Sequence, residues 1–549
     1  MSDLVDSALT TRFLRGLATA PDRTAVRVGT SRVTYSELHE LALRRAGDLH
    51  AAPGGPPRAV GVLTDRSLEG YAGVLAALYA GATVVPLHAG FPLERTRRML
   101  VTAGVDAVIA DGPGLTTLRE LDRHGLRLPV LAPEAGDTGP DAIPAAGRPL
   151  DAPARVRDTD HAYILFTSGS TGRPKGVPLT HGMIRHYFRL ADRHYDFHAG
   201  DAFSQTFDLN FDCAMFDMFC AWGAGASLHP VPAQAYRDLR GFFAERNLTV
   251  WFSAPSAISL ARRTRGLAPG GMPTLRWSLF AGEALRAADV ADWQAAASAA
   301  TVENIYGPTE LTLTVTGHRW SPGTSPDLCV NGLVPIGALH EGHDHLLLTP
   351  DGAFSAHEGE LCVTGPQMTP GYLEPQDDEG RFLRHDGRRW YRTGDRVRAL
   401  DNGELVYLGR YDSQVQVNGW RVELAEIEFA LGACPGVRDA VAVTRTTGGT
   451  TEIAVFYTGE LVPAARLTKQ LAELLPKGML PRRFTHLAEF PLNSNRKIDR
   501  RRLAEEADGE AGGDAAGQAD AGAVGRTDGE AVGRTDGGAV GRTDGEAAG

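Results

Sequence analysis

The chain has 549 residues, of which 43% are hydrophobic and 22% are charged, and its formal net charge at pH 7 is −11. This composition is typical of a globular protein, and the length exceeds what one hydrophobic core usually supports. The negative charge disfavours nucleic acid or an anionic membrane as the main partner, because both repel acidic surfaces.

Cysteine usage and the N-terminus indicate the compartment. The five cysteines show no metal-binding spacing, and their odd number suits a reducing cytoplasm. The chain does not open with a basic and then apolar signal sequence. Its most apolar stretch, residues 71–87, is interrupted by Gly73, Gly81 and Pro86, so it predicts a helix followed by a strand at 83–85 rather than a membrane span. We expect a cytoplasmic protein with no membrane partner.

The first 400 residues alternate short apolar runs with longer amphipathic segments, a pattern that predicts an α/β fold with doubly wound sheets. The predicted strands lie at residues 59–63, 83–85, 107–110 and 163–166. The predicted helices include an amphipathic one at 36–50 and an apolar one at 215–222. We expect a large N-terminal domain over residues 1–411.

The pattern of apolar and polar residues changes after residue 400. Residues 405–409 and the alternating run 414–417 predict strands, and residues 422–433 have helical spacing with acidic residues in the early turns. We place a domain boundary at Asp412 and expect a small, mobile α+β domain over residues 412–505. Residues 506–549 contain near-copies of Ala-Val-Gly-Arg-Thr-Asp-Gly that begin at 523, 531 and 539, and they predict a disordered repeat tail.

A loop rich in Gly, Ser and Thr, residues 167–176, directly follows the strand predicted at 163–166. Its glycines, hydroxyl groups and Lys175 are what a loop needs to wrap closely around phosphates. It is not the P-loop of nucleotide triphosphatases, because Lys175 lies between Pro174 and Gly176 rather than between the last Gly and a Ser or Thr. The alternative is a flexible connection, which the preceding strand and the cation disfavour.

Many segments in a fixed order resemble the adenylate-forming superfamily, and within it the stand-alone amino-acid adenylation enzymes of nonribosomal peptide synthesis, near the D-alanine–carrier protein ligases. The resemblance extends to about Arg502. The segments are Thr34-Tyr35-Ser36-Glu37-Leu38, residues 79–87, the loop 167–176, Phe211-Asp212, residues 280–283, residues 304–310, Gly359-Glu360-Leu361, residues 391–395, residues 409–412, residues 418–423 and residues 495–500.

The resemblance implies ATP and Mg²⁺ as cofactors. It implies that Lys175 and the loop residues Thr167, Ser168, Gly169, Ser170, Thr171 and Gly172 hold the β- and γ-phosphates. It also implies that Glu310 binds Mg²⁺, that Thr309 contacts the α-phosphate, and that Lys497 is the catalytic lysine bridging the substrate carboxylate and the α-phosphate. A loop acid or a lysine in a basic run is usually just solvated, and the surrounding motifs favour the functional alternative here.

The resemblance assigns the remaining nucleotide contacts to five residues. Tyr306 offers a ring to adenine, Asn304 an amide to its edge, Asp395 a carboxylate to the ribose diol and Arg410 a guanidinium to ribose or phosphate, and Gly282 lies beside them. Asp412 falls at the hinge of the superfamily, where the small domain turns between adenylation and thiol transfer.

Asp212 distinguishes amino-acid substrates, because its carboxylate would pair with an α-ammonium group. The alternative is an acid that only stabilises the start of the following helix. By resemblance, the rest of the substrate pocket is Cys213, Phe216, Phe252, Leu279, Ala281, Ile305, Leu313 and Thr314. None of these is charged, so we expect a small to medium neutral amino acid, with its stereochemistry open.

No phosphopantetheine attachment motif follows Lys497, so the product is expected to pass to a separate carrier protein in trans. Two alternatives remain open. One is an acyl-coenzyme A ligase for a small carboxylic acid, and the other is a non-catalytic nucleotide or amino-acid binding protein of the same fold.

Overall fold

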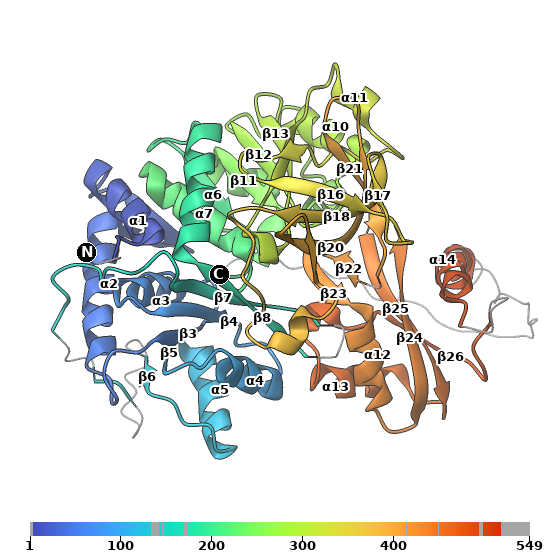
Figure 1. The fold of residues 1–549 in the computed structure, drawn as a ribbon, viewed down its shortest axis with the longest axis horizontal. Coiled ribbons are helices and arrows are strands. Elements are labelled where there is room, and N and C mark those ends of the chain that lie inside the picture. The colour runs from blue at the N-terminus through green and yellow to red at the C-terminus, as the bar shows by residue number, and fades with distance from the viewer. Residues whose placement is uncertain are drawn as a thin grey trace, which may run out of the picture.

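The computed structural model describes residues 4–132, 142–144, 148–169, 173–412, 414–447, 450–492 and 498–517. Residues up to 412 form a large unit of layered sheets and helices, and residues from 414 form a small unit beside it (Figure 1). The predicted mixture of α/β layers with a smaller C-terminal unit is confirmed. Asp412 lies between β21 (Leu405–Arg410) of the large unit and β22 (Gln414–Val417) of the small unit.

The first sheet of the large unit contains the strands predicted near the N-terminus. From β6 to β7 all neighbouring strands are parallel, and β8 closes the edge in an antiparallel pair with β7. In sheet order the strands are β6 (Val130–Leu131), β5 (Ala107–Ala110), β3 (Ala59–Leu63), β4 (Thr83–Leu87), β7 (His161–Thr167) and β8 (Lys175–Thr180). The predictions at 59–63, 83–85, 107–110 and 163–166 are therefore confirmed.

The second sheet is parallel from β13 to β1, with antiparallel strands at both edges. In sheet order its strands are β15 (Ala338–Leu339), β14 (Thr316–Arg319), β13 (Thr301–Tyr306), β12 (Trp277–Phe280), β11 (Val250–Ser253), β9 (Ala202–Gln205), β10 (Ser227–Pro230), β1 (Thr24–Val28) and β2 (Ser31–Thr34). Ligands of such sheets usually bind at the carboxyl ends of the parallel strands.

Helices cover these sheets, and two of them are buried on all sides. The α-helices of the large unit are α1 (Ala8–Thr19), α2 (Tyr35–His50), α3 (Leu68–Tyr79), α4 (Leu93–Thr102), α5 (Gly112–Arg123), α6 (His181–His194), α7 (Asp212–Ala224), α8 (Leu239–Arg246), α9 (Ser256–Arg263), α10 (Ala287–Ala296) and α11 (Ser325–Leu328). Short 3-10 turns are η2 (Ala233–Arg237), η3 (Thr309–Leu311) and η4 (Pro375–Asp378).

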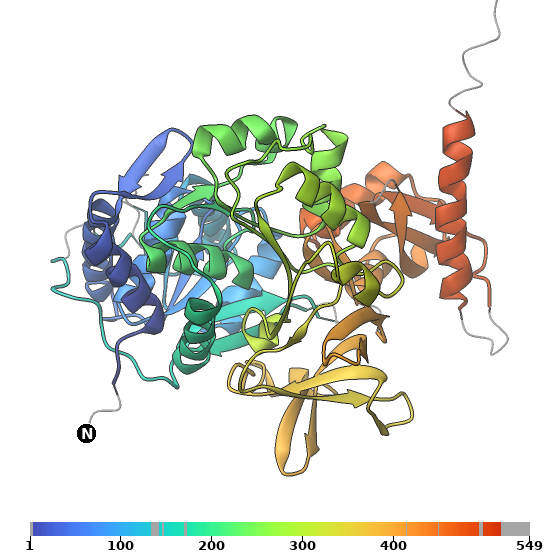
Figure 2. The ribbon, with the colours of Figure 1, turned by 90° about the horizontal axis from the view of Figure 1, so that it is seen from above.

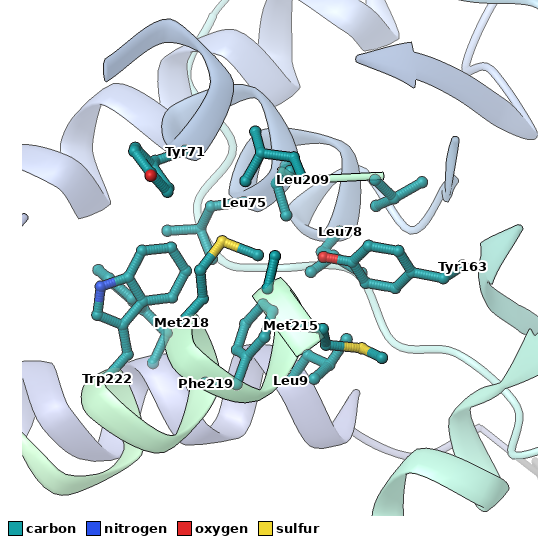
Figure 3. Packing of buried hydrophobic residues seen from close by; sticks show 14 of the residues in the cluster. Leu9, Tyr71, Leu75, Leu78, Tyr163, Leu209, Met215, Met218, Phe219 and Trp222 are labelled. Atoms are coloured by element: carbon teal, nitrogen blue, oxygen red, sulfur yellow. The ribbon is translucent and has the colours of Figure 1, made fainter. Parts of the chain in front are cut away.

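The central core lies where α3 and α7 face each other. Figure 3 shows Tyr71, Leu75 and Leu78 of α3 packed against Met218 and neighbouring residues of α7. Both helices are apolar around their whole circumference, which is typical of a helix buried between layers. Burial of α7 on all sides fixes the position of its first residue, Asp212.

One segment of the resemblance has a purely structural explanation. The Thr34 hydroxyl accepts a hydrogen bond from the Glu37 amide at 3.2 Å, and the Glu37 carboxylate accepts one from the Thr34 amide at 2.8 Å. This reciprocal pair is a capping box that starts α2. The buried Tyr35 then donates its hydroxyl to the Ala226 carbonyl at 2.6 Å.

A third, antiparallel sheet completes the large unit and was not predicted beyond the strand at 405–409. In sheet order its strands are β17 (Phe354–Ser355), β16 (Asp344–Leu348), β18 (Glu358–Thr364), β20 (Arg388–Ala399) and β19 (Phe382–His385), with β21 paired to β20. β20 and β21 reach the small unit, so this sheet leads the chain to the junction.

The small unit comprises the hairpin β22–β23 (Trp420–Glu423), a sheet of β24 (Val437–Thr447), β25 (Thr450–Gly459) and β26 (Arg483–His486), and the helical segments α12 (Leu424–Gly432), α13 (Ala464–Ala472), η5 (Lys477–Met479) and α14 (Arg500–Gly517). Figure 2 shows α14 on the side of this unit that faces away from the large unit. Within the described residues, no helix combines the length and apolarity needed to cross a bilayer.

Two boundaries in the small unit differ from the sequence predictions. The helix expected from Val422 begins at Leu424, because Val422 pairs with Val415 inside the hairpin. Helix α14 continues to Gly517, beyond residue 506, where we expected the disordered tail to begin. Its first turns pack Leu503 and Ala507 against the β24–β25 sheet, and this apolar contact supports the start of the helix. The repeats lie outside the described residues.

Candidate active site

A cavity of about 550 Å³ lies between the two units. Its floor is formed at the carboxyl ends of β12 and β13, where parallel strands usually place ligands. One wall comes from β20 and β21, and the hairpin β22–β23 of the small unit closes the opposite side with Asn418, Gly419 and Arg421. Most of the predicted functional residues meet here.

The nucleotide residues expected by resemblance gather at this cavity. Gly282, Asn304, Tyr306, Thr309, Asp395 and Arg410 all line it. Gly307 allows the turn after β13 to approach the chain closely, since a Cβ there would lie 2.4 Å from the Leu313 carbonyl oxygen.

Asp395 is buried and already has partners for both carboxylate oxygens. The Tyr306 hydroxyl donates to Oδ2 at 2.5 Å, and Arg410 donates to Oδ1. Burial raises the pKa of Asp395, and the Arg410 guanidinium opposes that rise. Asn304 is also engaged, since its amide donates to the Pro335 carbonyl at 2.9 Å. Each of these oxygens carries a second lone pair, so Asp395 could still accept hydrogen bonds from a ribose diol.

The Gly/Ser/Thr loop connects β7 to β8, and Ser170, Thr171 and Gly172 lie outside the described residues. Lys175 is buried rather than free in solution: its Nζ lies 3.7 Å from Asp377 Oδ1 and 5.1 Å from the centre of the Tyr372 ring. Burial lowers the pKa of Lys175, and Asp377 counteracts the shift. The Ser168 hydroxyl donates to the Arg421 carbonyl of the small unit at 2.8 Å.

Glu310 is fully buried on η3, yet its carboxylate is paired twice. The Tyr372 hydroxyl donates to Oε1 at 2.7 Å, and Arg421 of the small unit donates to Oε2 at 2.7 Å. Burial alone would raise its pKa, but the Arg421 charge and the Tyr372 hydrogen bond prevail and lower it to about 2. Glu310 is therefore ionised and faces a cation.

Asp212, at the first turn of α7, has the opposite environment. It lines the cavity and is 8% exposed, but its Oδ2 has no hydrogen-bond partner within the described residues. Burial raises its pKa to about 6, although the Cys213 amide and the Thr309 hydroxyl donate to the carboxylate. The cavity thus contains a buried acid for which the described part of the chain supplies no counter-charge.

The other predicted substrate residues fall into two groups. Cys213, Ala281, Ile305, Leu313 and Thr314 line the cavity beside Asp212. Phe216, Phe252 and Leu279 are buried in the core cluster that adjoins the cavity and do not line it. The rings of Phe216 and Phe252 contact each other edge to face, with their centres 5.2 Å apart.

Lys497, the predicted catalytic lysine, lies outside the described residues. Its neighbour Arg500 begins α14 and pairs with Glu428 at 2.6 Å. Asp412 contacts two arginines of the large unit, Arg410 at 2.6 Å and Arg381 at 3.6 Å. Burial raises the pKa of Asp412, but hydrogen bonds from Arg410 outweigh it and lower the pKa.

Two residues at the cavity received no role from the sequence. Glu283 accepts hydrogen bonds from the Gly419 amide at 2.7 Å and from the Ser256 amide at 2.8 Å, so it joins the hairpin to the large unit. Arg421 reaches Glu310 from the same hairpin. Both residues belong to segments of the resemblance, 280–283 and 418–423. The sequence did not indicate which residues they contact.

A second cavity, of about 230 Å³, adjoins the first and shares Phe207, Phe211 and Gly419 with it. Its wall includes Trp420, whose ring centre lies 5.3 Å from that of Phe211. Gly419 has φ +81°, and a Cβ there would lie 3.5 Å from Ala254, so glycine suits this turn.

Comparisons with known proteins match this geometry. Residues 13–373 match the family model described as AMP-binding enzyme. The L-proline--[L-prolyl-carrier protein] ligase of Pseudomonas fluorescens is 31% identical over 514 residues, which cover 91% of this chain and 99% of that protein. The chain spans only 13%, 38% and 42% of three other curated relatives.

Two solved structures are similar over most of their length. IdnL7 has 54% sequence identity and a TM-score of 0.71, over 93% of this chain and 100% of that chain. The adenylation domain AlmE of Vibrio cholerae, in complex with glycyl-adenosine-5'-phosphate, has 28% identity and a TM-score of 0.81, over 92% of this chain and 98% of that chain.

Proposed function

This chain belongs to the AMP-binding enzyme family, and we propose that it activates a small to medium neutral amino acid with ATP and transfers it to a carrier protein. In the first step the amino-acid carboxylate attacks the α-phosphate of ATP, which forms an aminoacyl adenylate and releases pyrophosphate. In the second step the phosphopantetheine thiol of a separate carrier protein takes the aminoacyl group and AMP leaves.

The observation that carries the choice of an amino acid is the unpartnered Oδ2 of Asp212 at the cavity. A buried carboxylate without a counter-charge is costly, and an α-ammonium group would supply both the charge and a hydrogen bond. The start of α7 alone would not explain this cost, because Cys213 and Thr309 leave Oδ2 without a partner. A carboxylic acid without an amino group would leave Asp212 in the same unfavourable state.

The lining of the cavity supports a neutral side chain of modest size. The predicted substrate residues that line the cavity beside Asp212 are uncharged, and Phe216 and Phe252 pack tightly behind them. Relatives point the same way: one similar ligase is named for L-proline, and AlmE was solved with a glycyl adenylate. We propose the class of small to medium neutral amino acids, without a preference for one stereoisomer.

The nucleotide and metal would use residues that fit them. Tyr306, Asn304, Asp395 and Arg410 would hold adenosine, and the loop at 167–176 with Lys175 would hold the β- and γ-phosphates. Glu310 fits a hard cation such as Mg²⁺, because it is ionised and already accepts a cationic donor at Oε2. When bound, Mg²⁺ would neutralise phosphate charge. The described residues include no group of three or more His, Cys, Asp or Glu side chains that could hold a metal ion, and Glu310 would be the residue of this chain that holds Mg²⁺.

Lys497 would contribute a positive charge between the substrate carboxylate and the α-phosphate as the new bond forms. Thr309 would connect the two substrates, because it lines the cavity together with Asp212 and precedes Glu310 in η3. Asp412 would act as the hinge, since the small unit must turn to bring Lys497 in for adenylation and the hairpin in for thiol transfer.

The second cavity supports the transfer step. It reaches the main cavity beside Gly419, and it would admit the thiol arm of a carrier protein.

Exchange of labelled pyrophosphate into ATP tests the whole proposal, with amino acids compared against fatty and aryl acids. Exchange only with acids that lack an amino group would overturn it in favour of an acyl-coenzyme A ligase. Binding of ATP without any exchange would favour a non-catalytic binding protein.

A further inference from the structure

The hairpin β22–β23 is held against the large unit by two of its carboxylates, the half-buried Glu283 and the fully buried Glu310. Glu283 accepts from the Gly419 amide at 2.7 Å, and Glu310 accepts from the Arg421 guanidinium at 2.7 Å. The two contacts differ in chemistry. The first contact joins a carboxylate to a neutral backbone amide. The second joins a cation to Glu310, the residue at which we propose that Mg²⁺ binds.

Arg421 is fixed in this place from several sides. Its Nε donates to the Gln414 side chain at 2.8 Å, and its carbonyl accepts from the Ser168 hydroxyl of the proposed phosphate loop at 2.8 Å. Its side chain is 15% exposed, and that of Glu310 is 0% exposed. Arg421 therefore contacts a proposed metal ligand, Glu310, and a proposed phosphate ligand, Ser168, at the same time.

We propose that Arg421 is a positioning residue whose guanidinium takes the place of the divalent cation at Glu310, so that docking of the hairpin and occupation of Glu310 by the cation exclude each other. The buried Glu310 carboxylate accepts from Tyr372 at Oε1 and from the Arg421 guanidinium at Oε2, and one cation is enough to compensate its charge. The guanidinium and a divalent cation would therefore compete for the same carboxylate. The hairpin can then dock only when the metal has left. This inference rests on the proposed function for the identity of the metal.

The Glu283 contact provides an internal control. It also fastens the hairpin, but it involves no group that a divalent cation would replace. Loss of this contact should weaken docking without changing the response of docking to metal. Loss of the Arg421 guanidinium should remove that response, because the docked hairpin and the cation could then be present together.

A distance measurement on the full chain tests the proposal without any turnover. Val101 of α4 and Phe429 of α12 are 56% and 68% exposed, and α4 contacts α12 through Arg95 and Glu426. Spin labels on V101C and F429C therefore report whether the small unit is docked, by pulsed dipolar spectroscopy. The parent chain without these two cysteines gives the background labelling. Mg²⁺ is titrated without nucleotide, with choline chloride keeping the ionic strength constant.

We expect Mg²⁺ to lower the docked-to-undocked ratio of the wild-type background by about fivefold or more. E283Q should begin with a smaller docked fraction and show the same relative decrease. R421Q should show little decrease. If R421Q is undocked before metal is added, R421K decides, because it retains a positive charge and should keep the response to Mg²⁺.

Three results would overturn the proposal. The first is a docked-to-undocked ratio of the wild-type background that does not change with Mg²⁺. The second is a decrease of this ratio in R421Q as large as in the wild-type background. The third, which applies when R421Q is undocked from the start, is a ratio in R421K that does not change with Mg²⁺. Failure of the proposed function is separate and would appear as absent pyrophosphate exchange with every acid, while the response of the distance to Mg²⁺ could still be measured.

Discussion

Two buried carboxylates of the large unit, Asp212 and Glu310, have opposite charge environments. Both are buried, and burial raises the pKa of each. Among the described residues Asp212 has no cationic partner and its pKa rises to about 6, whereas Arg421 and Tyr372 lower the pKa of Glu310 to about 2. The difference shows that neighbouring cations and hydrogen-bond donors, rather than burial alone, decide whether a buried acid is ionised. One of these sites has its cation in the free protein, and the other would receive it from the substrate.

The largest expected effect comes from removing the unpaired acid. D212N should lower kcat/KM for amino-acid-dependent pyrophosphate exchange by about 10²- to 10³-fold, because a lost buried ion pair costs about 3–5 kcal/mol. The matched control is D217N on the same helix. Asp217 is also buried with both oxygens unpartnered in the described structure, but it lines neither cavity described above. Equal losses in both variants would contradict a role for Asp212 in substrate binding.

A smaller and more selective effect is expected at the junction. D412P should slow aminoacyl transfer to a carrier protein by about tenfold more than it slows pyrophosphate exchange, since proline fixes φ where the small unit must turn. D412N retains backbone freedom and should affect both steps alike, through its lost contacts to Arg410 and Arg381. Equal impairment of both steps by D412P would exclude a transfer-specific hinge.

The pH dependence of substrate capture should report Asp212. Its pKa is raised to about 6 in the free protein, and the ionised form is the one that pairs with an ammonium group. The kcat/KM for exchange should therefore be constant above pH 6 and fall about tenfold per pH unit below it. In D212N the residual rate should lose this inflection. An unchanged inflection in D212N would assign it to another group.

The two acids should also shift thermal stability in opposite directions, which is the smallest effect. The raised pKa of Asp212 means that the unfolded chain releases the proton first, so stability is lost as pH rises from about 4 to 6, by about 3 kcal/mol. D212N should then raise Tm at pH 7.5. The depressed pKa of Glu310 contributes stability that is present above about pH 4 and lost as pH falls toward 2. E310Q should lower Tm at pH 7.5. A change of Tm in the same direction for D212N and E310Q would contradict the opposite charge environments of the two acids.

Much of the fold was predictable because local patterns agree with it. The apolar runs at 59–63 and 107–110 are strands, and the apolar segment at 215–222 belongs to the fully buried α7. The antiparallel sheet of β16 to β20 was not predicted, because its strands carry many charged residues that pair across strands, such as Arg392 with Glu360. Alternation of apolar and polar residues is weak in such strands.

The candidate site was predictable as a set of residues but not as a set of partners. Asp212, Thr309 and Asp395 do meet at one cavity. The contacts of Glu310 with Arg421 and of Glu283 with Gly419 join positions more than 100 residues apart, and they depend on how the small unit sits. A single sequence contains no signal for that arrangement. The roles assigned to Phe216, Phe252 and Leu279 remain predictions, because these residues lie behind the cavity wall.

The second cavity has walls from both units, with Phe211 and Ala254 on one side and Gly419 and Trp420 on the other. Three of its lining residues, Asn418, Gly419 and Trp420, belong to the hairpin, so one side of this cavity would open if the hairpin moved away. Under the proposed mechanism, a thiol that arrives before the hairpin docks would find the cavity incomplete, and docking would complete it. The order of the two proposed reactions would then be set by when this cavity is assembled.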